Sequence, residues 1–295
     1  MLFRSMAERL LLNHYAMNRT ANGGYGHHNF VADAAGPRLM KPEFTEAVWC
    51  CTFHGLLGLH TLKSYVVTGS DRGVLINFPL PVSALVATAE GEFQVTVTAQ
   101  EQPGSLACSV QLEPRSPTAR PPEVRFRVPA WAERTRVTNR RGAPQKAPAA
   151  GGYLQLPAAV ATECQVTFEC APRVEDRRFR SVQPDAKTLT RHRGVTICDG
   201  PHLLLANTGQ VKPALVAVIS KDGRLRLPRG TDGGYRCVGV PDVDAAEPAM
   251  RDAARNGAVL SLLPWEQVRH DGPVAFVFDL IVVPEESPLA QALKP

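Results

Sequence analysis

The sequence has no long apolar run. None of its segments approaches the roughly 20 consecutive apolar residues that cross a bilayer as a helix. The first residues, Met-Leu-Phe-Arg-Ser-Met-Ala-Glu-Arg, also lack the apolar core of a secretory signal peptide. These two absences predict a protein without a membrane anchor. They also predict a cytoplasmic location, unless a signal peptide has been lost upstream.

A disulfide framework is lacking as well. The seven cysteines are an odd number and do not show the spacing of small disulfide-rich scaffolds, so we expect thiols in a reducing compartment. They stand at Cys50, Cys51, Cys108, Cys164, Cys170, Cys198 and Cys237. The last five lie on strand-like segments, where we expect them to act as small apolar residues of the core.

Signals for nucleotide or nucleic-acid binding are missing too. The net charge is +5, and the basic residues concentrate between 113 and 146 and between 173 and 193. They are not interleaved with aromatic residues in a stacking pattern, and no groove-binding motif, Gly-rich fingerprint or internal repeat is present. We therefore expect solvated arginines on strand faces and loops, and no nucleic-acid partner.

Helical periodicity marks two segments near the start of the chain. Apolar residues recur with i, i+3, i+4 spacing from Phe3 to His14, and again from Phe53 to Val66, with Gly69 closing the second predicted helix. Helices this short are marginal by themselves and need other structure to pack on. They either pack on the rest of the chain or are the last helices of a larger helical domain.

From Gly73 onward the apolar period changes to two. Short runs bounded by Pro and Gly predict strands at 74–78, 93–97, 107–112, 124–128, 153–156, 164–170, 194–198, 214–219 and 274–283. Such strands are typical of a β-sandwich. A charged linker near 172–187 predicts a second, smaller β-unit after it, with a helical or irregular insertion around 245–256.

The most informative motif is the adjacent pair Cys50-Cys51, within Glu-Ala-Val-Trp-Cys-Cys-Thr-Phe-His. The pattern places it at the end of a short helical segment. Neighbouring cysteines do not bridge each other comfortably, but both can bind one soft metal ion, or one can attack a substrate while the other binds the metal. Buried structural thiols are the alternative interpretation.

Nearby residues offer some further metal donors. His54 follows Cys51 by three positions, His27-His28 form a pair upstream, and Glu46 supplies a carboxylate. A four-ligand zinc site of the Cys-Cys-x-x-His type would still need another residue. We instead expect His54 on a helix face and the two adjacent histidines in a polar loop.

Six motifs follow one another in an ordered way over residues 1–206. They are the Cys-Cys pair between two helices, Val-Leu-Ile-Asn-Phe-Pro-Leu-Pro (74–81), Val-Arg-Phe-Arg-Val-Pro-Ala-Trp-Ala (124–132), Gly-Gly-Tyr-Leu (151–154), Ala-Pro-Arg-Val-Glu (171–175) and Arg-Gly-Val-Thr-Ile-Cys-Asp-Gly-Pro-His-Leu-Leu-Leu-Ala (193–206). This order resembles the C-terminal portion of the β-L-arabinofuranosidase-like enzymes of glycoside hydrolase family 127.

The resemblance implies a mainly β fold, with two β-sandwich-type units preceded by the last helices of a truncated (α/α)6 barrel. On this basis residues 1–70 would be the barrel remnant that carries Cys50-Cys51. Residues 71–180 would form the middle β-sandwich domain and residues 188–295 the C-terminal β-domain. The helices near the start of the chain would then belong to a domain that lies largely upstream.

The resemblance also implies a chemistry. In such enzymes two adjacent cysteines, an upstream cysteine and an upstream glutamate hold zinc, and a separate glutamate acts as acid and base. By this mapping Cys50 is the nucleophile and a zinc ligand, and Cys51 is a zinc ligand. Zinc keeps a thiol deprotonated near neutral pH, and sulfur replaces the usual carboxylate nucleophile of a retaining glycosidase.

This chain departs from the family pattern before and after the pair. The 49 residues before Cys50 contain no cysteine and no matching glutamate motif, and Thr52-Phe53-His54-Gly55 replaces the usual Pro-Pro-Asn-like residues. We therefore expect a fragment that is inactive alone, whose parent cleaves L-arabinofuranosidic or similar linkages. A barrel domain, in cis or in trans, would complete it. The alternative is a free-standing β-sandwich module that binds carbohydrate or another chain without catalysis.

Overall fold

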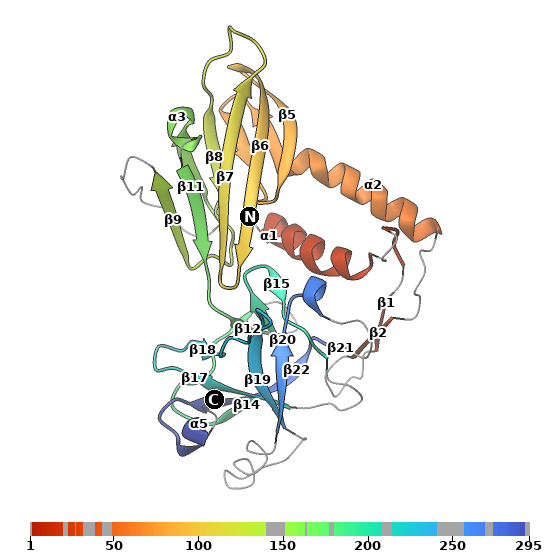
Figure 1. Cartoon of the computed structure of the whole chain (residues 1–295), viewed down its shortest axis with the longest axis vertical. Coiled ribbons are helices and arrows are strands. Elements are labelled where there is room, and N and C mark those ends of the chain that lie inside the picture. The colour runs from red at the N-terminus through yellow and green to blue at the C-terminus, as the bar shows by residue number, and fades with distance from the viewer. Residues whose placement is uncertain are drawn as a thin grey trace. The chain divides into compact units, whose positions relative to one another are not determined.

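The computed structural model describes most of the chain and divides it into two compact units (Figure 1). Residues 2–19, 23–26, 28–31, 39–42, 49–139, 151–162, 164–176, 180–207, 214–240, 257–268 and 274–292 are described. Unit 1 comprises Met1–Leu11 and Trp49–Cys170, and unit 2 comprises Leu12–Val48 and Ala171–Pro295.

The described residues of unit 1 form three helices and nine strands. These are α1 (Leu2–Arg9), α2 (Trp49–Val66), β3 (Val67–Ser70), β4 (Gly73–Ile76), β5 (Val82–Thr88), β6 (Gly91–Gln102), β7 (Ser105–Pro114), β8 (Glu123–Arg127), β9 (Arg134–Asn139), β10 (Tyr153–Pro157), α3 (Ala158–Ala161) and β11 (Cys164–Glu169).

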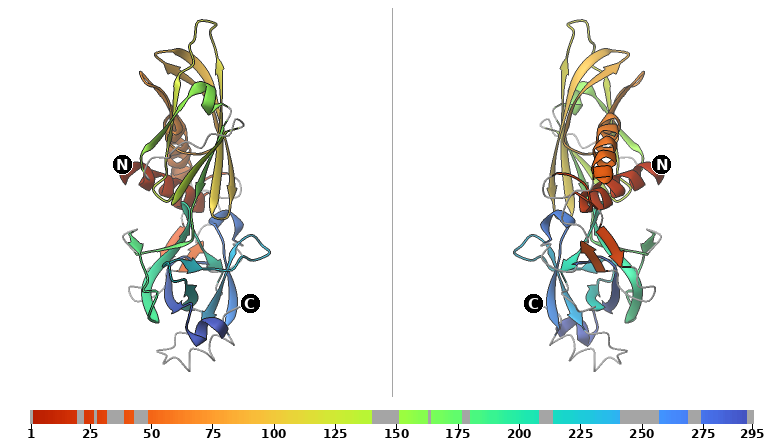
Figure 2. Two further views of the ribbon diagram at one scale, coloured as in Figure 1. Left: turned by 90° about the vertical axis from the view of Figure 1, so that its left-hand side faces the viewer. Right: turned by 90° about the vertical axis from the view of Figure 1, so that its right-hand side faces the viewer.

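Two sheets of unit 1 form a sandwich. One has five strands in the order β5-β6-β7-β11-β9, and the other has four in the order β10-β8-β4-β3. Successive side chains along a strand point to opposite faces of the sheet, and the apolar Val95, Val110, Val166 and Phe126 point inward and are almost completely buried in one core. Helix α2 runs beside this sandwich (Figures 1 and 2).

Unit 2 is also mainly β. It contains η1 (Leu10–Tyr15), a π-helical segment that follows α1 and belongs to this unit from Leu12 on. The other elements are β1 (His28–Val31), β2 (Leu39–Pro42), β12 (Arg173–Glu175), β13 (Ser181–Val182), β14 (Thr190–Asp199), β15 (His202–Leu203), β16 (Ala206–Asn207), β17 (Ala214–Ile219), β18 (Leu225–Arg226), β19 (Tyr235–Val240), β20 (Ala258–Leu262), η2 (Trp265–Gln267), β21 (Val274–Ala275), β22 (Phe278–Pro284) and α5 (Pro288–Ala292).

The strands of unit 2 form one large and one small sheet. The large sheet has the order β13-β12-β14-β22-β17-β19-β20, with β15 on β14 and β18 on β17, and the small one has the order β1-β2-β21-β16. Strands β17 and β22 pair in parallel, and both consist almost entirely of buried aliphatic residues. Such near-continuous apolar runs are expected for strands that are covered on both faces.

Most of the predicted strands are confirmed, and the overall class is mainly β with sandwich-type packing. Each of the nine predicted runs contains a strand, although 274–283 divides into β21 and β22. The predicted insertion at 245–256 lies outside the described residues. The domain limits 1–70, 71–180 and 188–295 stay a prediction, as does the assignment of the helices to a truncated barrel.

Two expectations about the second helix are wrong. The Cys50-Cys51 pair lies in the first turn of α2 and not at the end of a helix. The helix ends at Val66, before Gly69, which belongs to β3. Strand β3 pairs with β4, and a Cβ atom on Gly69 would meet the backbone oxygen of Ala87. This close approach of two strands, which requires glycine, explains why that residue lies within a strand.

Candidate functional site

The thiol pair sits at the start of α2. The two sulfur atoms, Cys50 Sγ and Cys51 Sγ, lie 3.8 Å apart, and both side chains are half-buried. No disulfide joins any of the seven cysteines, all of which lie in the described ranges. The predicted reduced state of these cysteines is therefore what the structure contains.

The separation of the sulfurs suits a shared tetrahedral ion. Zinc binds thiolate sulfur at about 2.3 Å, so two sulfurs at a tetrahedral angle on one zinc ion lie about 3.8 Å apart. The Cys50 and Cys51 sulfurs have this separation without any rearrangement. The pair therefore fits half of a four-coordinate site, and two further donors would be needed to complete it.

His54 lies one helical turn beyond the pair. Its Nδ1 atom is 2.8 Å from the carbonyl oxygen of Cys50, and its side chain is exposed. When Nδ1 carries the proton it donates to that carbonyl, which leaves Nε2 as the acceptor. Metal-binding histidines commonly use one ring nitrogen in this way. Within the described ranges, however, no group of three or more His, Cys, Asp or Glu side chains is placed to hold a metal ion.

The surroundings of Cys51 disfavour its thiolate. Burial raises the pKa of the Cys51 thiol, and the hydrogen bond and charge of the neighbouring Cys50 sulfur raise it further. The dipole of α2 acts in the opposite direction, because the N-terminal end of a helix favours negative charge. A cation between the two sulfurs would remove the repulsion between them, which adds to the larger effect of burial on the Cys51 pKa.

The other predicted donors are only partly described. His27 and Glu46 lie outside the described residues, as do the acidic residues Asp33 and Glu43, and of His28 only its place in β1 is described. Of the four acidic residues that precede Cys50, Glu8 is therefore the one whose surroundings can be examined.

Glu8 takes part in a buried ion pair. Its Oε2 atom accepts a hydrogen bond from an Arg127 guanidinium nitrogen at 2.7 Å, and the two side chains are 1% and 3% exposed. Burial raises the pKa of Glu8 despite the opposing attraction of Arg127. The indole nitrogen of Trp131 lies near enough to lower that pKa, but makes no well-formed hydrogen bond. The pair holds α1 on the sandwich and faces no open space.

Asn77 connects this ion pair to the end of α2. Its side-chain nitrogen donates to the carbonyl of Tyr65 at 3.0 Å, and its backbone nitrogen donates to the carbonyl of Val66 at 2.9 Å. These are orphan acceptors of the last helical turn. Arg127 Nε donates to the Asn77 carbonyl, and the Tyr153 hydroxyl donates to its side-chain oxygen at 2.6 Å. The C-terminus of α2 is thus fixed to the core of unit 1.

Helix α2 has an apolar face that stays exposed. Gly55 and Val66 face the sandwich and are buried, whereas the opposite side carries an exposed stripe. This α2 stripe consists of Trp49 (84% exposed), Phe53 (63%), Leu56 and Leu57. The spacing i, i+4, i+7, i+8 is that of a helix prepared to pack on another element. The stripe begins beside Cys50.

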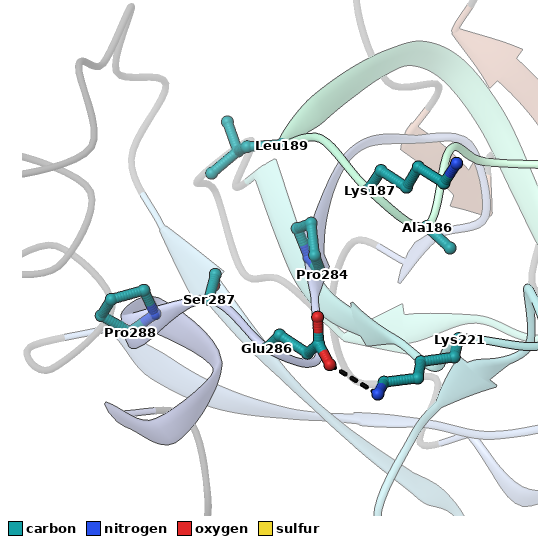
Figure 3. A pocket seen from close by; sticks show the side chains of 8 residues that line it. All are labelled: Ala186, Lys187, Leu189, Lys221, Pro284, Glu286, Ser287 and Pro288. Atoms are coloured by element: carbon teal, nitrogen blue, oxygen red, sulfur yellow. Dashed lines mark ion pairs between the residues drawn. The ribbon is translucent and has the colours of Figure 1, made fainter.

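Unit 2 holds a pocket of about 640 Å³ near its C-terminus (Figure 3). Lys187, Lys221, Glu286 and Ser287 supply its polar lining, and Lys221 Nζ pairs with the Glu286 carboxylate. Glycoside hydrolysis of the usual kind needs two carboxyl groups on opposite sides of the scissile bond. A single, paired carboxylate does not meet this requirement, so we do not place the candidate site here.

Several other sequence-based expectations can be compared with the structure. Of the five cysteines expected in the core, Cys108, Cys164, Cys198 and Cys237 are buried, as predicted, whereas Cys170 is only half-buried. The expectation of solvated arginines is wrong for one residue of the first basic cluster, Arg127, because its charge is neutralised inside the core. No helix in the described ranges is long and apolar enough to cross a membrane.

Comparisons with known proteins show a shared fold. Neither a family model nor a curated protein matches the sequence. Among solved structures, one described as a glycoside hydrolase matches 94% of this chain and 48% of its own, with a TM-score of 0.57 and 14% identity. A GH127 β-arabinofuranosidase matches 94% of this chain and 45% of its own, again with a TM-score of 0.57 and 14% identity. A GH127 β-L-arabinofuranosidase from Geobacillus stearothermophilus T6 matches 95% of this chain and 46% of its own, with a TM-score of 0.52 and 11% identity.

The predicted resemblance to GH127 proteins is thereby confirmed at the level of the fold. The chain spans about half the length of the solved structures that it matches. This share agrees with the prediction that the resemblance concerns one portion of these proteins.

Proposed function

We propose that this chain is the C-terminal part of a retaining glycoside hydrolase that resembles β-L-arabinofuranosidases. Two observations support the proposal. The fold matches GH127 structures over nearly the whole chain, and the two sulfurs of Cys50 and Cys51 have the separation that one tetrahedral ion requires. The second observation carries the assignment of the site, because the likeness of fold alone says nothing about chemistry.

In the proposed reaction Cys50 is the nucleophile. Its thiolate attacks the anomeric carbon, a carbon–sulfur bond forms, and the glycosidic carbon–oxygen bond breaks as the leaving oxygen takes a proton from a carboxylic acid. In the second step the resulting carboxylate takes a proton from water, the water oxygen bonds to the anomeric carbon, and the carbon–sulfur bond breaks, which regenerates the thiolate and the carboxylic acid with retention of configuration. A zinc ion, when bound by Cys50 and Cys51, would keep both sulfurs deprotonated near neutral pH.

The chain alone is proposed to be inactive. Neither the acid that protonates the leaving group nor the remaining two metal donors has been located among the described residues. Glu8 does not suit the acid role, because its carboxylate is buried against Arg127. A helical domain, in cis or in trans, would supply the missing groups, and it would also cover the α2 stripe next to Cys50.

Hydrolysis of p-nitrophenyl β-L-arabinofuranoside tests the catalytic part. We expect no release of nitrophenol above the buffer rate by the purified chain, with or without added zinc. Release that disappears in Cys50→Ala but persists in Cys170→Ser would contradict the proposed inactivity, while supporting the role of Cys50.

Metal titration tests the site itself. Cd²⁺ replaces Zn²⁺ at thiolates and gives a ligand-to-metal absorption band, so we expect one weakly bound ion per chain through two sulfurs. The band should be lost in Cys50→Ser and in Cys51→Ser, and it should persist in Cys170→Ser. An unchanged band in either of the first two variants would remove that cysteine from the site.

A further inference from the structure

Two neighbouring rows of hydroxyl and amide side chains lie on the outer face of the five-stranded sheet of unit 1, beside the exposed Leu85 of β5. Strand register aligns Ser83 of β5 with Thr96 of β6 and Gln111 of β7 in one row. The residues that alternate with them, such as Val95 and Val110, are buried in the sandwich, so this row faces outward. Figure 1 shows the five strands side by side from β9 to β5.

A second row runs beside the first and crosses one more strand. It consists of Thr98 of β6, Ser109 of β7, Gln165 of β11 and Thr138 of β9, each opposite the next in the register. With neighbouring strands about 4.8 Å apart, this row is about 14 Å long, and it lies about 7 Å from the first. We call the two rows together the polar face.

The polar face carries no charge. Charged side chains on this side of the sheet begin only beyond the rows, at Glu113 on β7 and at Arg136 on β9, where Arg136 pairs with Glu169. A quarter of a typical chain is charged, and exposed strand faces usually share in those charges. An uncharged area of this size therefore favours an uncharged partner.

Several groups of the polar face have hydrogen-bonding capacity to spare. Ser83 and Thr96 bond to each other at 3.1 Å, and Gln94 donates to Ser83 at 2.9 Å. By contrast, the amides of Gln111 and Gln165 make no side-chain hydrogen bond with any residue in the described ranges. Each such amide offers two donor hydrogens and an acceptor oxygen at adjacent positions.

We propose that the polar face binds a neutral polysaccharide. Sugar hydroxyl groups both donate and accept, which is the combination that the glutamine amides and the threonine and serine hydroxyls provide. A protein partner would require an apolar centre with aromatic residues, and a nucleic acid or an acidic glycan would require clustered Arg or Lys. The rows have neither. Because no aromatic ring is available for stacking, the affinity is weak and comes from several hydrogen bonds along the chain of sugars.

This inference goes beyond the proposed hydrolase activity and does not depend on it. The polar face lies on strands of unit 1 and uses no residue of the thiol pair. It supports the kind of carbohydrate-binding module that was the alternative expectation from the sequence, and here it gives that module a definite surface. Cys50→Ala should bind the polysaccharide as the unaltered chain does. The proposed hydrolase function and the proposed binding of a polysaccharide can therefore be tested separately.

Affinity electrophoresis of the whole chain in gels containing neutral arabinan tests the proposal. We expect retardation that grows with arabinan concentration, and none with polygalacturonate at the same concentration. The retardation should be the same in low and high salt, because exposed charges that salt would screen take no part. Absence of retardation by neutral arabinan and by other neutral glycans would overturn the proposal.

Charge placed in the rows provides the matched comparison. Gln111→Glu combined with Gln165→Glu should weaken retardation at least five-fold. Each substitution removes the two N–H donors of the amide and places a negative charge on the polar face. Gln155→Glu, the same change at an exposed position on β10 of the other sheet, should leave it unaltered. Equal weakening by both, or by neither, would contradict the assignment.

The same variants separate a glycan from a second copy of the chain. If the polar face paired two molecules, size-exclusion chromatography without glycan would show a dimer that the double variant abolishes. We expect no effect of the double variant on the elution volume. A dimer lost in that variant would overturn the proposal in favour of self-association.

Discussion

The Arg127 guanidinium and the Glu8 carboxylate form a 2.7 Å ion pair inside unit 1, with both side chains almost fully buried. The two residues lie 119 positions apart in the sequence, on β8 and α1. The pair thus joins the first helix of the chain to the sandwich. A buried pair of this kind is a weak source of net stability, but it is costly to break.

Arg127→Met should destabilise the protein by about 3–5 kcal/mol, because it leaves the Glu8 carboxyl buried without a partner. Urea unfolding monitored by circular dichroism measures the change. Arg125→Met removes an arginine of the same strand that is 16% exposed and whose partner Glu123 is 35% exposed, and it should cost less, about 1 kcal/mol. Equal losses of unfolding free energy in the two variants would mean that the burial of the Arg127–Glu8 pair does not increase the cost of breaking it.

The stability of the protein should also depend on the protonation of Glu8. Burial raises its folded-state pKa above the ordinary value of 4.5, so the folded state binds the proton more tightly than the unfolded state. Stability contributed by this group is complete below pH 4.5 and falls as pH rises through the folded-state pKa.

Glu8→Gln removes that titration, so the comparison of the two proteins isolates it. The stability advantage of the unaltered chain over Glu8→Gln should therefore shrink as pH rises above 4.5. Urea midpoints at a series of pH values from 4 to about 7 measure the difference. An advantage that grows over this range would mean that Arg127, and not burial, dominates the pKa of Glu8.

Asn77 should matter for the anchoring of α2. Asn77→Ala removes the hydrogen bond to the Tyr65 carbonyl and leaves the Tyr153 hydroxyl without its acceptor, with an expected cost of about 1–3 kcal/mol. Hydrogen exchange should show faster exchange in the last turns of α2. Ser83→Ala, an exposed change in β5, is the control and should leave α2 protection unaltered.

The seven thiols should differ in reactivity. Burial raises the pKa of Cys108 and of Cys237 to about 12, so at pH 8 almost none of either is thiolate. Brief treatment with iodoacetamide should modify the half-buried Cys50 and Cys51 and leave Cys108 and Cys237 unmodified, as peptide mass spectrometry can measure. Urea-unfolded protein should react with iodoacetamide at all seven cysteines. Early modification of Cys237 in the folded chain would show that β19 opens readily.

The strands were predictable because alternation is a local property. In β11, and in β6 from Glu92 to Ala99, each inward residue is apolar and each outward one polar, and the sandwich follows from that period. Strand β8 shows the limit of prediction from alternation. Its alternation places Arg125 and Arg127 on the same side, yet only Arg127 is buried, because its partner on α1 is 119 positions away and invisible to any local pattern.

The candidate site was predictable in its residues and less so in its setting. Adjacent cysteines identify a two-sulfur donor pair from sequence alone, but their separation depends on the helical backbone that α2 imposes. The start of α2 was misplaced because a helix that is apolar on all sides gives no clear period. The role of Asn77 at the other end of α2 follows from strand β4 returning to it, and no spacing rule reports such a contact.

The exposed position of Trp49 makes the α2 stripe an optical reporter. In a Trp265→Phe variant, which keeps two of the three tryptophans, the buried Trp131 should keep a blue-shifted emission that is insensitive to quenchers, whereas the exposed Trp49 should be quenched by iodide. Anything that covers the stripe, whether a helical domain or a detergent, should shift the Trp49 emission to shorter wavelength. The chain thus contains its own fluorescent measure of whether the face beside Cys50 is covered.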